Sequence, residues 1–339
     1  MDDAAASAIA PCIVCGAREA DPWAEGGDKK FSGPGRFAYR RCRHCGMVWL
    51  EPQLSADRLA RYYPDHLTPV ARPGGGTWRD RARQWLKRAV AEEWYGYGDV
   101  RGPAARPWPQ RLVRRALGWP LRRLLRQVPR YRPGGRVLDI GCGSGGYLTF
   151  LAELGWTCQG IEPGAASRAY AQRELGLDVQ AGPLEACRFP DACFDVVTMW
   201  HVIEHLQDPP AALREIRRVL KPDGRLLLRT PNAQSWEAGL FRGNWYHLDP
   251  PRHLYLFSPQ TMERLLRQCG FAVVRVGYDT HVVDCSRSLL YALQDRAGAG
   301  LYGAARRMLP VLELMLRLGL PLRRLAGRGG SLHVEAGKA

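Results

Sequence analysis

The sequence predicts an α/β fold: a doubly wound parallel sheet with a small N-terminal metal-binding module and added helices. Between residues 133 and 283, short β-branched runs alternate with amphipathic stretches, a pattern typical of a parallel α/β sheet. A glycine-rich turn follows the first of these runs, and the first 70 residues contain two Cys-x-x-Cys-Gly pairs. No apolar run approaches the roughly 18 to 20 residues of a membrane-spanning helix, so none is predicted.

The elements of the sheet can be placed in chain order. Apolar runs predict strands at residues 136–140, 157–162, 194–200, 225–229 and 271–276. Amphipathic runs predict helices that end at residue 154, cover 165–175 and 210–220, and begin after residue 258. Ser258 is a typical N-cap, Pro259 suits the first helical position and Gly270 is a typical C-cap. A strand-like segment at residues 331–335 follows an amphipathic helical stretch.

Composition and motifs divide the chain into three parts. Residues 1–70 form a zinc-ribbon-like module, residues 71–132 a basic and mostly helical linker region, and residues 133–339 the α/β domain. We expect a helical insertion at about residues 284–328 of this domain.

The glycine-rich turn carries the strongest chemical signal. Gly141 and Gly143 stand between a predicted strand and a helix, where glycine lets the backbone approach a ligand closely. Glu162 lies 21 positions after Gly141, at the end of the next strand, and suits hydrogen bonds to ribose hydroxyls. Asp139, two residues before Gly141, suits a cationic or amine-bearing ligand better than a pyrophosphate.

Four segments in this order resemble the class I S-adenosylmethionine-dependent methyltransferases. They are VLDIGCGSGG, GIEP, FPDACFDVVTMWHVIEHLQDP and LREIRRVLKPDGRLLLRTPN, within residues 133–283. The resemblance implies a Rossmann-like methyltransferase sheet and S-adenosylmethionine as the methyl donor. It also implies cofactor contacts from Asp139, Gly141, Gly143 and Glu162, and adenine-side contacts from Leu184 and Glu185.

Residues 243–258 narrow the resemblance to a bacterial subgroup linked to glycan, lipid or secondary-metabolite pathways. We therefore expect a small-molecule acceptor, such as an anionic sugar or a lipid-linked glycan intermediate. Two alternatives stay open: an RNA methyltransferase that grips phosphates, and a non-catalytic scaffold that keeps the cofactor fold. The residues after the strand at 194–200 do not form an Asn-Pro-Pro-Tyr-like base-flipping motif, and the intact glycines argue against a scaffold.

The paired cysteines predict one structural zinc ion. Cys12, Cys15, Cys42 and Cys45 supply four thiolates, a set that suits tetrahedral zinc and leaves no open position for catalysis. The 26 intervening residues predict a ribbon hairpin with its tip near residues 28–36. The remaining six cysteines show no pairing pattern and are interpreted as small buried apolar residues.

Trp200 and His201 end a buried strand, and ligands of open α/β sheets bind beyond the carboxyl ends of strands. Either residue is therefore expected to contact the cofactor or the acceptor. Glu204 and His205 follow one turn later and are expected to hold the loop together. Binding of a divalent ion by His201, Glu204 and His205 is the alternative role, and hydrogen bonding is preferred over it.

The second polar loop, residues 247–253, contains the first choice for a catalytic base. A hydroxyl acceptor needs a base, and histidine supplies one near neutral pH. His253 is the first choice and His201 the second. The alternative is that Asp249, Arg252 and His253 form a hydrogen-bond cluster that anchors the loop.

The net charge of +16 is concentrated in the linker region. Residues 71–132 contain sixteen Arg or Lys and four Asp or Glu, which favours an anionic partner such as RNA, lipid headgroups or a phosphorylated substrate. Only five of the 49 basic residues are Lys, so codon bias explains the excess of Arg equally well. Amphipathic stretches at 112–128 and 309–325 are expected to pack on the domain rather than on a membrane. The acidic N-terminus predicts a cytoplasmic protein, with peripheral contact at the inner membrane face as the alternative.

Overall fold

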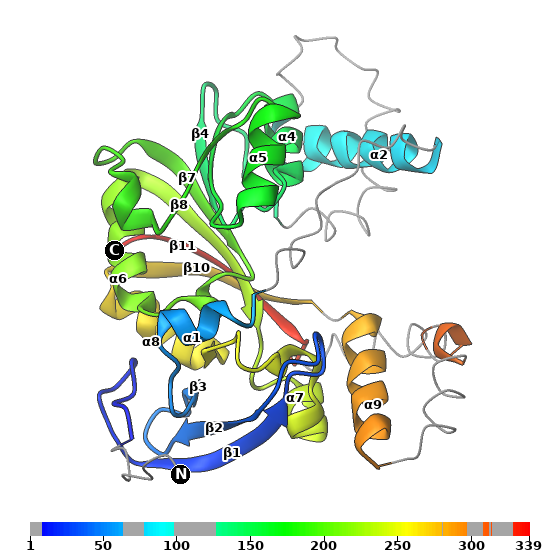
Figure 1. Cartoon of the computed structure of the whole chain (residues 1–339). Coiled ribbons are helices and arrows are strands. Elements are labelled where there is room, and N and C mark those ends of the chain that lie inside the picture. The colour runs from blue at the N-terminus through cyan, green and yellow to red at the C-terminus, as the bar shows by residue number, and fades with distance from the viewer. Residues whose placement is uncertain are drawn as a thin grey trace. The chain divides into compact units, whose positions relative to one another are not determined.

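A mixed seven-stranded sheet is the largest element of the fold in the computed structural model (Figure 1). The structure describes residues 9–63, 78–97, 127–279, 281–296, 308–311, 313 and 328–339. The chain divides into two compact units. The first comprises Met1–Pro64, Met199–Arg217 and Leu228–Ala339, and the second comprises Asp65–Thr198 and Arg218–Leu227. The strands β7 and β8 contain residues of both units.

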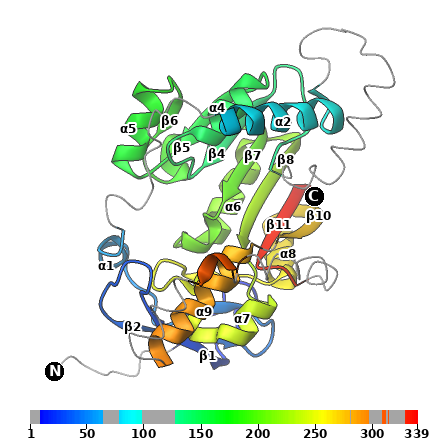
Figure 2. The same cartoon turned by 90° about the vertical axis from the view of Figure 1, so that its right-hand side faces the viewer.

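The strand order in the large sheet is β10-β11-β8-β7-β4-β5-β6. These strands are β4 (Arg136–Ile140), β5 (Thr157–Ile161), β6 (Asp178–Gln180), β7 (Phe194–Trp200), β8 (Leu220–Pro231), β10 (Phe271–Asp279) and β11 (Ser331–Lys338). The strands β4, β5 and β6 pair in parallel, and β11 pairs antiparallel with β10, which Figure 2 shows beside it. All five predicted α/β strands and the final strand-like segment are confirmed. The sheet differs from the predicted parallel one because β10 and β11 are antiparallel neighbours.

The helices follow the predicted pattern within each unit. In the second unit, α4 (Gly146–Glu153) contacts β5, and α5 (Ala165–Arg173) contacts β6. In the first unit, α8 (Pro259–Gln268) contacts β10, and its N-terminus has a capping box between Ser258 and Thr261. The predicted helix at 210–220 is α6 (Pro209–Val219). The predicted N-cap at Ser258 is therefore confirmed.

A four-stranded sheet in the first unit contains the cysteine pairs. Its order is β1-β2-β3-β9, from β1 (Ala20–Gly27), β2 (Arg36–Cys42), β3 (Val48–Leu50) and β9 (Tyr255–Leu256). The strands β1 and β2 pair antiparallel, so the predicted hairpin with its tip at 28–36 is confirmed. The strand β9 comes from about 200 residues later and pairs with β3. Backbone hydrogen bonds therefore join the N-terminal ribbon to β9 and Leu254, which follow the loop at residues 247–253.

The remaining described helices are short or lie at the edges of the predicted regions. They are α1 (Ala56–Ala60), α2 (Trp78–Trp94), α7 (Trp236–Phe241), α9 (Val282–Arg296) and the 3-10 helices η3 (Leu184–Cys187), η4 (Ile203–His205), η5 (Arg242–Asn244) and η6 (Tyr246–Leu248). In the first unit, α9 contacts α7, η5 and η6. No helix among the described residues is long and apolar enough to cross a membrane.

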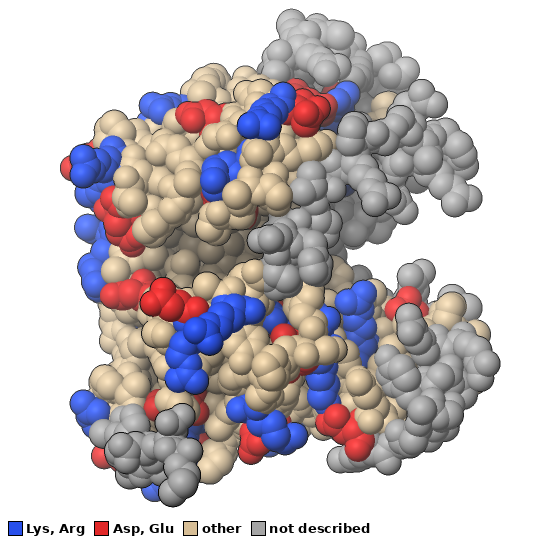
Figure 3. All heavy atoms as spheres, viewed as in Figure 1, with Lys and Arg blue, Asp and Glu red and all other residues tan. Residues whose placement is uncertain are grey.

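Most residues of the two predicted amphipathic stretches, 112–128 and 309–325, lie outside the described residues. The same holds for much of the basic region 71–132, whose charge therefore stays a sequence observation. On the face shown in Figure 3, the described Lys and Arg side chains are interspersed with Asp and Glu. The three-part division at residues 70 and 132 stays a prediction.

Candidate active site

The glycine-rich turn and Glu162 lie together in the second unit. Gly141 and Gly143, which follow β4, have φ angles of 73° and 56°, a region that favours glycine. The Glu162 carboxylate, 6% exposed, accepts hydrogen bonds from the backbone N–H groups of Gly143 and Gly164, both at 2.8 Å. Each carboxylate oxygen accepts one of these bonds. Because a carboxylate oxygen has two acceptor sites, each oxygen retains capacity for a ligand hydroxyl.

Asp139 is buried near the C-terminal end of β4. Its Oδ1 accepts a hydrogen bond from the Thr198 hydroxyl at 2.6 Å. Burial raises the pKa of Asp139 to about 7, against the effect of Thr198, and Glu162 raises it further. Leu184 is buried and Glu185 exposed at the start of η3, which follows β6. A nearby cation would hold Asp139 ionised, because an opposite charge favours the charged form of a carboxyl group.

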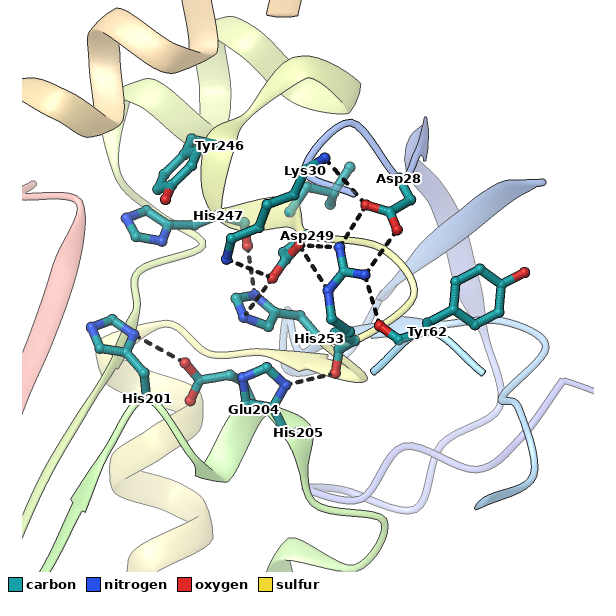
Figure 4. Close-up of polar contacts among 12 residues, drawn as sticks. Asp28, Lys30, Tyr62, His201, Glu204, His205, Tyr246, His247, Asp249 and His253 are labelled. Carbon is teal, nitrogen blue, oxygen red and sulfur yellow. Dashed lines mark hydrogen bonds and ion pairs between the residues drawn. The ribbon is translucent and has the colours of Figure 1, made fainter. Parts of the chain in front are cut away.

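A histidine–glutamate pair follows directly after β7 in the first unit (Figure 4). His201 has a φ of 59°, and its Nδ1 lies 3.1 Å from Oε1 of Glu204. The Thr230 hydroxyl donates to the other Glu204 oxygen at 3.0 Å. Burial favours a neutral Glu204, but the hydrogen bond with His201 lowers the pKa of Glu204 to about 2. Glu204 is thus an ionised, fully buried carboxylate that fixes the imidazole of His201.

His201 is the more accessible of the two predicted catalytic histidines. Its side chain is 33% exposed, and its ring stacks on His247 with centroids 6.0 Å apart. Burial lowers the pKa of His201 while Glu204 raises it, and the net shift is downward. His201 is therefore neutral near pH 7, as a general base must be. Trp200, the last residue of β7, is half-buried and belongs to the first unit.

His253 lies in the buried interior of the same unit. It is 5% exposed, and its Nδ1 lies 2.8 Å from the carbonyl oxygen of His247. Burial, together with the neighbouring His205, lowers the pKa of His253 to about 3. Tyr39 donates its hydroxyl to the carbonyl oxygen of His253 at 2.8 Å. These contacts are those of a residue that fixes its loop.

Arg252 joins this loop to the tip of the β1–β2 hairpin. Its guanidinium is 1% exposed and donates to both carboxylate oxygens of Asp28, at 2.6 and 2.8 Å. It also donates to Oδ1 of Asp249 at 2.6 and 3.1 Å. Lys30 adds an ion pair with Asp249 at 3.2 Å. The predicted anchoring cluster is therefore present, and the sequence did not indicate Asp28 as its main partner.

The four predicted zinc ligands converge in the N-terminal sheet. Their sulfur atoms all lie within 4.8 Å of one another, with 3.5 Å between Cys12 and Cys45 and 3.4 Å between Cys15 and Cys42. Zinc–thiolate bonds of about 2.3 Å place sulfurs about 3.8 Å apart in a tetrahedron. The backbone N–H groups of Gly16 and Gly46 close two equivalent turns onto Cys12 and Cys42. The arrangement fits one tetrahedral zinc ion.

A cavity of about 570 Å³ lies in the first unit, between the N-terminal sheet and α7. Three arginines, Arg41, Arg242 and Arg328, and two tryptophans, Trp23 and Trp236, belong to its lining. The Arg242 guanidinium lies 5.9 Å from the centroid of the Trp23 ring. Sequence analysis missed this site because its residues come from segments that lie far apart in the chain. The cavity combines positive charge and aromatic faces, which suits a small anionic ligand.

Comparisons with known proteins find similarity to methyltransferases within this chain. Residues 110–276 match a family model described as a methyltransferase domain. A ubiquinone biosynthesis O-methyltransferase of Pseudomonas entomophila (strain L48) is 37% identical over 105 residues, covering 29% of this chain and 45% of the relative. A malonyl-[acyl-carrier protein] O-methyltransferase of Serratia marcescens is 34% identical over 134 residues, covering 39% and 51%. This chain thus spans about half the length of the curated relatives it matches.

A solved structure of an S-adenosylmethionine-dependent methyltransferase from Mesorhizobium loti aligns with a TM-score of 0.44 and 17% identity. The alignment covers 64% of this chain and 97% of that one.

Proposed function

Because this chain belongs, through residues 110–276, to the S-adenosylmethionine-dependent methyltransferases, we propose that it methylates an oxygen atom of a small-molecule acceptor. The observation that carries the proposal is the His201–Glu204 pair at the end of β7. Such a pair can accept the proton that a hydroxyl acceptor loses. The two relatives described above are also named as O-methyltransferases, which supports an oxygen acceptor.

The methyl donor is proposed to bind the residues around the glycine-rich turn. Glu162 is ready to accept hydrogen bonds from the two ribose hydroxyls, and Asp139 provides negative charge close by. Bound S-adenosylmethionine supplies an electrophilic methyl group on a sulfonium. The other proposed contacts are Gly141, Gly143, Leu184, Glu185 and Trp200.

His201 is proposed to act as the general base. Glu204 holds Nδ1–H of the imidazole, so the opposite nitrogen, Nε2, receives the acceptor's proton. His253, the base that the sequence favours, stays a prediction. Its burial and low pKa support the anchoring alternative, because a base with a pKa of about 3 gives little driving force at neutral pH.

The acceptor is proposed to be anionic. The arginine-lined cavity supports this, because three guanidinium groups from separate segments line a space large enough for a small molecule. The cavity-lining residues 233–236 follow Arg229 by a few residues in the chain. The carbonyl oxygen of Arg229 accepts a hydrogen bond from the backbone N–H of His201, so the same segment contacts His201 and lines the cavity.

The test is methyl transfer from labelled S-adenosylmethionine into fractionated cell extracts. We expect label in small anionic hydroxyl compounds, and the label should be lost with the His201→Ala variant. Label that enters only the RNA fraction would contradict the proposal and favour the RNA alternative.

Replacement of Glu162 by alanine is expected to weaken S-adenosylmethionine binding by about 10- to 100-fold. The loss of charged hydrogen bonds of about 1.5 to 3 kcal/mol accounts for this range. Calorimetry on the purified chain measures it. Glu174→Ala, an exposed carboxylate on the neighbouring helix end, is the control and should leave the affinity unchanged. Equal affinities in both variants would remove Glu162 from the proposed site.

The four-cysteine cluster is proposed to bind one structural zinc ion. Elemental analysis of protein purified without chelator should find zinc at this site, and Cys15→Ser should remove it and lower Tm. The matched control is Cys187→Ser, which changes one of the cysteines of the second unit that do not belong to the cluster. Because β9 belongs to the same sheet, loss of zinc should also loosen the loop at residues 247–253. Zinc-free protein with unchanged Tm would refute this role.

A further inference from the structure

A second group of metal-ligating side chains lies in the first unit, apart from the cysteines. Glu204, His205 and His253 each offer one ligand atom, and these three atoms lie within 4.8 Å of one another. Figure 4 shows the three side chains close to one another, with Glu204 and His205 on η4 and His253 on the loop at residues 247–253. We propose that these three residues bind a divalent transition-metal ion. This site goes beyond the proposed function and does not depend on it.

The first argument concerns the protons of the two imidazoles. Nδ1 of His253 lies 2.8 Å from the carbonyl oxygen of His247, and Nδ1 of His205 lies 3.0 Å from that of Arg252. A carbonyl oxygen only accepts hydrogen bonds, so each Nδ1 carries the proton. In a neutral imidazole the other nitrogen, Nε2, is then an acceptor with a free lone pair.

The second argument concerns what the cluster lacks. The Glu204 oxygens accept hydrogen bonds from His201 and Thr230, so Glu204 adds acceptor oxygens to the two Nε2 lone pairs. The rings of His205 and His253 meet edge to face, with centroids 4.6 Å apart. Nε2 of His253 is 3.8 Å from Oδ2 of Asp249, another acceptor. A cation placed among these acceptors would interact favourably with all three of them.

The third argument concerns the outer contacts of the three residues. Metal-binding histidines usually donate their second ring N–H to a backbone carbonyl or carboxylate, which fixes the ring and the tautomer. Both histidines here have this contact, and Glu204 is held by His201 and Thr230. Tyr63 adds a hydroxyl 2.9 Å from Nδ1 of His205. The ligands are therefore already oriented before any ion binds.

The ligand set indicates the class of ion. Two imidazoles and one carboxylate suit zinc or iron(II) and leave positions open for water or another oxygen ligand. Metal–ligand bonds of about 2.0 to 2.2 Å place the donor atoms about 3 to 3.5 Å apart. Atoms already within 4.8 Å reach this spacing by small side-chain rotations.

The experiment is a titration of the full-length chain, with its cysteine site first filled with zinc, using cobalt(II) as the probe. We expect one equivalent of cobalt(II) to bind as the second metal ion of the chain, after the zinc ion. It should give visible absorption without thiolate charge-transfer bands, because its ligands are nitrogen and oxygen. His205→Gln should weaken this second site by more than about 100-fold, since even outer contacts contribute 10- to 100-fold. His44→Ala, an exposed histidine beside the cysteines, is the control and should bind both equivalents.

The spectrum of the wild-type protein keeps the proposal testable if His205→Gln fails to fold. Absence of a second equivalent at millimolar cobalt, or thiolate bands for every bound ion, would overturn the proposal and leave the cluster as hydrogen bonds alone. Because the readout is metal binding, a failed methyl-transfer assay leaves the outcome unaffected.

Discussion

The His201→Ala variant is expected to lose about 10²- to 10⁴-fold in kcat while it retains its affinity for S-adenosylmethionine. The reason is that Nε2 of His201 accepts the acceptor's proton, and Glu204 holds the ring in position for it. Glu204→Gln should give a smaller loss, because the neutral amide still accepts the hydrogen bond but no longer stabilises the protonated ring. The measurement is kcat and KM with a methylated acceptor, together with calorimetry for the methyl donor.

The pH dependence gives a second readout of this base. The folded pKa of His201 lies below its ordinary value, so the ring stays neutral and active at pH 6.5 and above. We expect kcat to fall only when the pH drops through the lowered pKa. His253→Ala is the comparison variant, and we expect it to lower Tm and raise the acceptor KM. Full kcat in both variants would exclude acid–base catalysis by either histidine, and methyl transfer would then depend on proximity and orientation alone.

Replacement of Arg252 by methionine is expected to lower the free energy of unfolding by about 3 to 5 kcal/mol at pH 7. The variant leaves the carboxylates of Asp28 and Asp249 buried without their shared guanidinium. Lys30 still forms an ion pair with Asp249. Urea unfolding measures the change. Arg36→Met, on the same hairpin, removes an ion pair whose partners are 72% and 54% exposed, and it should leave the free energy of unfolding nearly unchanged.

Acid should narrow the difference between the wild-type protein and Arg252→Met. The pKa values of Asp28 and Asp249 are lowered in the folded protein: burial opposes ionisation, but Arg252 and neighbouring charges and hydrogen bonds outweigh it. A depressed folded pKa contributes stability above the unfolded value of about 3.9, and this stability is lost as the pH falls further. A constant difference from pH 7 to pH 3 would show that Arg252 acts through packing alone.

The loop at residues 247–253 shows where prediction from sequence ended. The pattern of His, Asp and Arg on either side of two adjacent prolines indicated a polar loop near the acceptor, and it left His253 open as base or anchor. The choice depends on burial and on Asp28, which lies more than 200 residues away in the chain. A residue's pKa and partners are set by neighbours in space, so no local pattern could decide between the two roles.

The sequence by itself determined the strands and helices of the α/β domain, the glycine-rich turn with Glu162 and the four paired cysteines. These features depend on local spacing, because strand periodicity, backbone freedom at glycine and a Cys-x-x-Cys turn are short-range properties. Only the tertiary structure decided that β9 completes the N-terminal sheet, that Thr230 fixes Glu204 and that three arginines line one cavity. Each of these contacts joins segments that are brought together by burial of the core. The order of the residues in the chain does not indicate these contacts.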